Sequence, residues 1–256
     1  MSEPEKDDFY VGYFDRAPSV VGAFVKGKVL LLLVLVAGVA ALLALAQGTF
    51  APAVFEFGNV RDFEGVIATK PYPMLRVSRP GESPGEAPTW SRYFLVDPFK
   101  FGADERVANL DGKRVRLAGT LVYRDDQTMI EIDASKDIEV LGEAAGGGAG
   151  LSFGTVTLVG EIVDSKCFLG VMNPGELKPH KACAVRCVSG GIPPVLVVRD
   201  GQGAARYFML ADTNGGQVND RVLDLIAEPV RIQGEMVRMD NLWVLKADPA
   251  TYQLVK

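Results

Sequence analysis

Short apolar runs separated by turn residues repeat along most of the chain and predict β-strands rather than long helices. The runs are rich in Val, Ile, Leu and aromatic residues. We expect strands over residues 60–69, 74–77, 93–96, 114–123, 128–132, 155–163, 195–198, 207–210, 230–237 and 242–246. Two stretches between these runs, 104–110 and 220–226, have a short helical pattern instead.

One long apolar run departs from this pattern near the N-terminus. Residues 29–46 (VLLLLVLVAGVAALLALA) contain no charged side chain. Eighteen such residues are enough to cross a bilayer, so we expect a transmembrane helix over 29–47. The competing interpretation is a cleaved signal peptide, because Ala44-Leu45-Ala46 imitates a cleavage site. The long run and the acidic segment before it favour an uncleaved anchor.

Basic residues are distributed unequally around this run. Lys26 and Lys28 directly precede it, whereas the first basic residue after it is Arg61. The positive-inside rule therefore predicts a cytoplasmic tail over 1–28. We expect a protein of the bacterial inner (plasma) membrane, with most of the chain on the periplasmic, extracytoplasmic side. That compartment is oxidising, which bears on the cysteines.

The remainder of the chain contains an internal repeat. VRLAGTLVYRDD, residues 115–126, matches VRIQGEMVRMDN, residues 230–241, without a gap. RYFLVD also matches RYFMLAD, which places Tyr93 opposite Tyr207 with an offset of 114 positions. A repeat on this scale predicts two copies of one domain rather than a solenoid. The recurring tyrosines are expected to pack the barrels.

Each copy has three strands, a short helix and two more strands, the element order of an OB-fold. We therefore predict an all-β protein with one N-terminal transmembrane helix and two tandem OB-like five-stranded barrels, each with a short helix between strands 3 and 4. The first domain covers 55–142, a Gly-rich linker covers 143–150, and the second domain covers 151–256. Gly119 and Gly234 recur where long strands are expected to bend.

The second copy contains an insertion. Gly65 and Tyr93 of the first copy are 28 positions apart, whereas the corresponding Gly160 and Tyr207 are 47 apart. The 19 additional positions fall between strands one and two, in a loop that OB-folds use for ligands. The insertion spans 164–194.

Every cysteine and the only histidine of the chain lie in this insertion. His180, Cys183 and Cys187 follow the spacing i, i+3, i+7, which places them on one face of a helix. The turn Asn173-Pro174-Gly175 can fold Cys167 back onto that face. We therefore predict that Cys167, His180, Cys183 and Cys187 form a metal site, with zinc, copper or an iron–sulfur centre as the cofactor.

The Cys-x3-Cys pair with its nearby histidine resembles copper sites of the Sco type and of the binuclear centre of oxidase subunit II. The resemblance covers only those residues. Two other interpretations remain open. A disulfide from Cys167 to Cys183 or Cys187 would staple the loop and contribute about 3 kcal/mol, or Cys183 and Cys187 would act as a thiol oxidoreductase pair.

Four charged residues flank the cluster: Asp164, Lys166, Lys178 and Lys181. We expect each to be a solvated loop charge; the alternative is that they tune the pKa of a thiol or steer a partner. The net charge of −5 argues against a nucleic-acid partner. The sequence contains neither a convincing Ser-His-Asp set nor a phosphate-binding glycine loop, so an enzyme is the less favoured expectation. Asp125-Asp126 and Asp240-Asn241 are expected to form hairpin turns.

These features favour a membrane-anchored protein with a metal or redox site, acting in metal delivery, electron transfer or assembly of a respiratory-type membrane complex. The alternative is a non-catalytic accessory subunit. In architecture the chain resembles the haem chaperone of cytochrome c maturation, an anchored periplasmic OB barrel. That family binds haem through a histidine with a tyrosine four residues on. Here Ala184 follows His180 at that offset, so haem binding is not expected.

Overall fold

The computed structural model describes residues 19–47, 53–81, 88–144 and 150–255. The chain forms two compact units, which divide after residue 51. Residues 1–18 of the expected tail and most of the expected Gly-rich linker lie outside the described residues.

The described part of the first unit, residues 19–47, is a continuous and mostly apolar helix. It consists of α1 (Ser19–Phe24), a π-helical turn η1 (Val25–Val29) and α2 (Leu30–Gln47). Residues 21–46 have a mean hydropathy of 3.1, and this helix is the one described helix long and apolar enough to cross a membrane. Both a membrane span and a signal sequence have these properties. The helical backbone begins at Ser19, ten positions before the expected start of the membrane span, so residues 19–28 of the expected tail are also helical.

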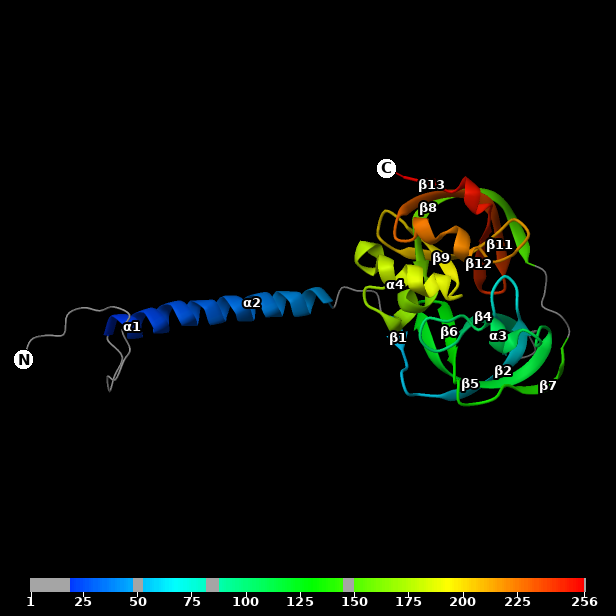
Figure 1. Cartoon of the computed structure of the whole chain (residues 1–256), viewed down its shortest axis with the longest axis horizontal. Coiled ribbons are helices and arrows are strands. Elements are labelled where there is room, and N and C mark those ends of the chain that lie inside the picture. Colours follow the sequence, from blue (N-terminus) through cyan, green and yellow to red (C-terminus); the bar gives the residue numbers. More distant parts are fainter. Residues whose placement is uncertain (1–18, 48–52, 82–87, 145–149, 256) are drawn as a thin grey trace, which may run out of the picture. The chain divides into compact units, whose positions relative to one another are not determined.

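The second unit is mostly β-structure and contains two closed five-stranded barrels (Figure 1). The strands of the first barrel are β2 (Arg61–Ala68), β3 (Met74–Arg79), β4 (Thr89–Val96), β5 (Lys113–Arg124) and β6 (Gln127–Ile132). Around the barrel the order is β2-β3-β4-β6-β5, and β5 closes it by pairing with β2. The β4–β6 pair is parallel and the other neighbours are antiparallel. The short helix α3 (Asp104–Val107) precedes β5, while β1 (Ala53–Phe55) and β7 (Glu139–Glu143) pair with β5.

The second barrel has the same strand order. Its strands are β8 (Leu151–Asp164), β9 (Pro194–Arg199), β10 (Ala205–Ala211), β11 (Pro229–Met239) and β12 (Leu242–Lys246). The β10–β12 pair is parallel, and β11 closes the barrel against β8. Strand β13 (Gln253–Leu254) follows the turn η5 (Pro249–Thr251) and pairs with β11. The helix expected over 220–226 is two 3-10 turns, η3 (Asn219–Arg221) and η4 (Leu223–Leu225).

The strand register corrects the expected match between Tyr93 and Tyr207. Phe94 pairs with Met129 in the first barrel, and Met209 pairs with Val244 in the second, so matched positions are 115 apart. Tyr93 therefore corresponds to Phe208. A shift of one residue turns a strand side chain to the opposite face. Accordingly, Tyr93 packs in the core of its own barrel, whereas Tyr207 belongs to a cluster shared by both barrels.

Counted from residues that the strand register matches, the insertion is longer than the sequence alignment predicted. Matched residues Gly65 and Met74 are 9 positions apart in the first barrel (74 − 65), whereas Gly160 and Val195 are 35 apart in the second (195 − 160). The loop between β8 and β9 is therefore 26 residues longer than its counterpart, rather than 19. It carries the π-helical turn η2 (Cys167–Val171) and the helix α4 (Leu177–Ser189).

The two barrels contact each other through their hairpin turns. Asp240, in the turn between β11 and β12, accepts hydrogen bonds from Arg76 Nε at 2.8 Å and from Arg92 Nε at 2.8 Å. In the opposite direction, the hydroxyl of Tyr207 donates to Asp125, in the turn between β5 and β6. Asp125 and Asp240 are 115 positions apart, so the two barrels contact each other with matched turns.

Gly234 is required for close packing, which makes a stability prediction possible. A Cβ there would lie 2.5 Å from the Lys246 carbonyl oxygen and 2.7 Å from Ala247 Cβ. We expect Gly234→Ala to lower the free energy of unfolding by about 1–3 kcal/mol, measured by urea titration. Gly201→Ala is the control, because a Cβ at Gly201 meets nothing within 4 Å. Equal stability of the two variants would contradict this explanation of Gly234.

Candidate metal centre

The cysteines and the histidine are held by two elements of the long β8–β9 loop. Cys167 begins η2, and His180, Cys183 and Cys187 lie on α4. Helix α4 ends at the Gly190-Gly191 pair, where the Gly190 N–H bonds to the carbonyls of Arg186 and Cys187. Helix α4 lies at the boundary between the two barrels (Figure 1). The chain reversal around residues 173–175 returns Cys167 to the helix, as the sequence predicted.

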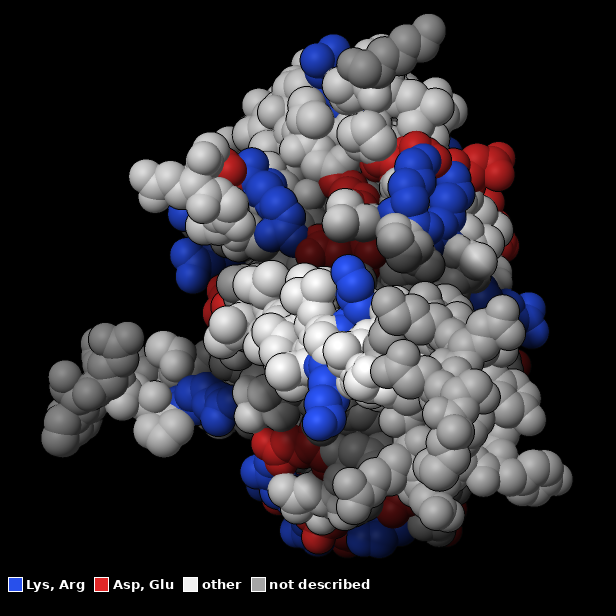
Figure 2. Space-filling model, turned by 90° about the vertical axis from the view of Figure 1, so that its left-hand side faces the viewer, with Lys and Arg blue, Asp and Glu red and all other residues white. Residues whose placement is uncertain are grey.

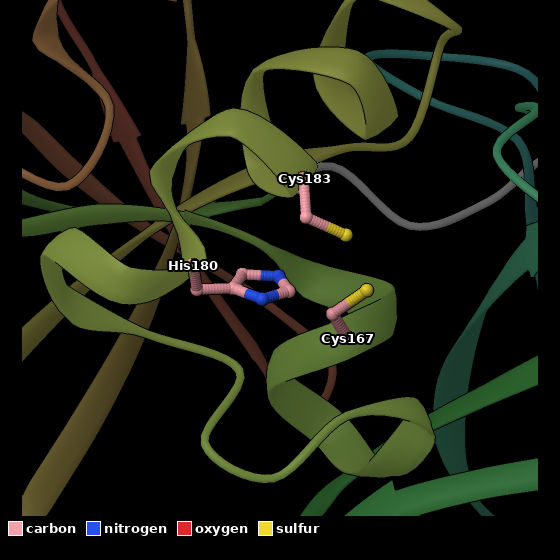
Figure 3. A group of neighbouring side chains, drawn as sticks. All are labelled: Cys167, His180 and Cys183. Atoms are coloured by element: carbon pink, nitrogen blue, oxygen red, sulfur yellow. The ribbon is translucent and has the colours of Figure 1, made fainter.

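The ligand-type atoms form two overlapping groups. The sulfurs of Cys167 and Cys183 and a ring nitrogen of His180 lie within 4.8 Å of one another. Figure 3 shows these three side chains directed toward a common space. The second group consists of the Cys167 and Cys187 sulfurs and a carboxylate oxygen of Asp164. The four predicted residues therefore lie close together, but Cys187 is grouped with Asp164 and only Cys167 belongs to both groups.

Asp164 is part of this site and not a solvated loop charge. Its side chain is fully buried, with one oxygen accepting the Cys167 N–H at 2.8 Å and the other 3.0 Å from His180 Nε2. Its position three residues before Cys167 was the available sequence signal. Cys167, His180 and Cys187 are also buried, while Cys183 is partly exposed. The site thus opens to solvent on the Cys183 side.

The remaining neighbouring charges divide into two kinds. Lys166 was also expected to be solvated, but it is 1% exposed and forms an ion pair with Glu131 of the first barrel. Lys178 and Lys181 lie on the surface and pair with Glu228, as expected of loop charges. Burial of Lys166 requires compensating partners, and the first barrel provides them.

Lys100 of the first barrel reaches the cysteines, which the sequence did not predict. It follows β4, and its Nζ donates to Cys183 Sγ at 2.8 Å and to Cys187 Sγ at 3.4 Å. Burial opposes the charge of this ammonium, but hydrogen bonds and attraction to the two sulfurs raise the pKa of Lys100 above its usual value. The site therefore contains residues from both barrels.

The thiols differ in their acidity. The Cys167 and Cys187 sulfurs are 3.9 Å apart. A hydrogen bond from Cys167, assisted by Lys100, lowers the pKa of Cys187 against the effect of burial. The same hydrogen bond, burial and the Asp164 charge raise the pKa of Cys167. The Cys187 thiol is therefore the more acidic of the pair. All three cysteines are free thiols in this structure.

Comparisons with known proteins found no relative, so the site is interpreted from the chemistry of its residues. No protein-family model, curated protein or solved structure matches the chain. Two thiol sulfurs and an imidazole nitrogen are soft or borderline ligands, which suit zinc and copper(I) better than magnesium or calcium. The arrangement can hold such an ion, and its closely spaced thiols can also exchange electrons by forming a disulfide.

Proposed function

We propose that this protein is a membrane-anchored, extracytoplasmic metal carrier that serves a membrane complex. The ion is held by Cys167, His180 and Cys183, with Cys187 and Asp164 beside it. The observation that carries the proposal is the convergence of these three ligand atoms within 4.8 Å in a largely buried place. A partly exposed ligand, Cys183, provides a route for the ion. The function is delivery of a soft metal, or electron transfer through it, during assembly of a respiratory-type complex.

We infer that the two barrels are OB-like and arose by tandem duplication. Two features support this inference. Both barrels share one strand order, in which the third and fifth strands form the parallel pair, and their matched residues keep an offset of 115 positions. In this interpretation the metal site occupies the loop between the first two strands of the second barrel, which OB-folds use for ligands.

We infer further that the apolar helix is an uncleaved anchor of a bacterial plasma membrane and that the barrels lie on the periplasmic side. Lys26 and Lys28 before the apolar run support this orientation. A C-terminal alkaline phosphatase fusion is then active, and a C-terminal fluorescent protein that folds only in the cytoplasm is dark. The opposite pair of results would overturn the orientation.

The surface charge argues against a nucleic-acid partner. On the face shown in Figure 2, the described Lys and Arg side chains lie in several separate groups, some of them beside Asp and Glu side chains, and do not form one extended positive area. Phosphate backbones bind to concentrated positive charge, which this face does not present.

The proposed metal site is tested by measuring metal content and free thiols together. We expect the full-length chain, purified in detergent under native redox conditions, to retain stoichiometric zinc or copper. The double variant His180→Ala, Cys183→Ala loses it, whereas Lys181→Ala, on the same helix but paired with Glu228, keeps it. One disulfide, one free thiol and no metal in the parent protein would exclude the proposal.

A thiol oxidoreductase is the second candidate, and the 3.9 Å separation of the Cys167 and Cys187 sulfurs favours it. The reacting pair would then be Cys167 with Cys187, rather than the Cys183–Cys187 pair suggested by spacing. A reversible redox transition that requires Cys167 and Cys187 but not Cys183, in a protein without metal, would favour this candidate over the metal carrier.

A further inference from the structure

We propose that Lys100 is a built-in competing cation, which occupies the cysteine site in the metal-free protein and weakens its hold on the ion. The inference rests on the proposed metal site and adds a residue that sets its affinity. It also gives the first barrel a role, because that barrel supplies the lysine.

The contact between Lys100 and the site is direct. The ammonium lies 2.8 Å from Cys183 Sγ and 3.4 Å from Cys187 Sγ, so it hydrogen-bonds two of the sulfurs of the site. Lys100 is 83 positions before Cys183, and only the packing of the barrels brings them together. A positive charge therefore already contacts one of the proposed ligand sulfurs, Cys183 Sγ, and the neighbouring Cys187 Sγ.

The backbone around Lys100 is fixed on both sides. The buried Lys166 ammonium donates to the carbonyl oxygens of Asp97 and Phe99, both at 2.8 Å. On the other side, the Gly102 N–H donates to the Gly190 carbonyl at 2.8 Å. A Cβ on Gly190 would lie 2.0 Å from the Lys100 carbonyl oxygen, so this approach requires glycine. Hydrogen bonds across the interface thus fix the backbone on both sides of Lys100 and place its side chain near the sulfurs.

Ammonium and metal ion compete for the same sulfur electrons. When Cys183 binds a metal ion, its sulfur is a weaker hydrogen-bond acceptor for Lys100. The metal ion and the Lys100 ammonium also repel each other when both contact the same sulfur. An interaction that exists only in the metal-free state must be broken when the ion binds, so its free energy is subtracted from the free energy of metal binding. Hydrogen bonds to charged groups are strong enough to account for about 10–100-fold. This is the behaviour of a transfer site, which must bind its ion and then release it.

The test compares the affinity of four full-length proteins for Co²⁺, measured by chelator competition and by thiolate-to-cobalt absorption under reducing conditions. We expect Lys100→Met to bind Co²⁺ about 10–100-fold more tightly than the parent protein. Lys100→Arg retains the cation and stays within about threefold of the parent. Lys178→Met is the matched control, because it removes a surface charge of α4 that pairs with Glu228, and its affinity is unchanged.

A purely structural role for Lys100 predicts the opposite sign, since a loosened site binds metal more weakly. Unchanged or weaker Co²⁺ binding by Lys100→Met therefore overturns the inference about Lys100. If the parent protein still binds Co²⁺ in that case, the proposed metal site itself is not overturned. Lys100→Gln repeats the measurement if the methionine variant is poorly folded. Absence of Co²⁺ binding by every protein, all folded by circular dichroism, overturns the proposed function and this inference with it.

Discussion

Cys167→Ser is expected to abolish stoichiometric metal binding, the largest functional effect of any single substitution in the site. Cys167 is the one residue common to both groups of ligand atoms. Serine replaces its soft sulfur with a hydroxyl, which zinc and copper(I) bind far less well. Structural zinc sites bind with about 10–16 kcal/mol, so losing one of the three proposed ligands lowers the affinity by about a hundredfold or more. Co²⁺ titration of the full-length variant measures the loss.

Cys187→Ser is the matched comparison, because it makes the same exchange at a buried cysteine that belongs only to the group with Asp164. We expect it to keep the ion with a loss of about tenfold, typical of a group beside the coordination shell. Both variants should unfold within about 1 kcal/mol of each other. Equal metal affinity of the two variants would show that Cys187 is as much a ligand as Cys167, and that the shared position of Cys167 has no special effect.

The barrel strands could be predicted because each buries alternate or continuous apolar residues and ends at a turn. The ten expected strands all occur, with ends that differ by a few residues. Strands β1, β7 and β13 escaped prediction because they are only two to five residues long. Strand β1 is half-buried, and β7 and β13 are largely exposed. Their pairing is decided by the edges of neighbouring strands, which have no local signal in the sequence.

The proximity of the cysteines and the histidine could be predicted because these residue types are rare here and their helical spacing is local. Asp164 and Lys166 were misjudged, since a charge in a loop is usually solvated. Both are buried, Asp164 against Cys167 and His180 and Lys166 against the first barrel. Lys100 could not be found at all. Its contact with Cys183 depends on how two barrels meet, and no periodicity in the sequence encodes that geometry.

The turn between β11 and β12 has two roles, because its residues both form the hairpin and contact the first barrel. Asp240 and Asn241 were expected in a hairpin for backbone reasons, and Asp240 does have the positive φ of such a turn. The same side chains also bind the first barrel: Asp240 pairs with two arginines, and the Asn241 side-chain oxygen accepts the Arg92 N–H at 2.7 Å. Turn residues thereby fix the interface that places Lys100 over the cysteines.

Asp240→Ala is therefore expected to destabilise the barrel unit more than any other surface-turn substitution. It leaves the guanidinium of Arg92, 3% exposed, without its carboxylate. Removing one partner of a buried ion pair costs about 3–5 kcal/mol. The lower end applies here, because Arg76 and Asp240 keep 13% and 15% exposure. Urea unfolding followed by tryptophan fluorescence measures the loss, since Trp90 stacks 4.2 Å from the Arg76 guanidinium.

The pH dependence of this loss identifies its origin. Burial opposes the Asp240 charge, but the hydrogen bonds from Arg76 and the charge of Arg92 outweigh it and lower the pKa of the carboxyl. The contribution is complete above the unfolded-state pKa of about 3.9 and declines as pH falls through the lower folded-state pKa. The stability difference between the parent and Asp240→Asn should accordingly be constant at neutral pH and shrink below about pH 4.

The matched turn provides the control. Asp125 accepts the neutral Tyr207 hydroxyl, so Asp125→Asn should lower the free energy of unfolding by about 1 kcal/mol. A larger loss at Asp125 than at Asp240 would mean that charge pairing does not hold the barrels together.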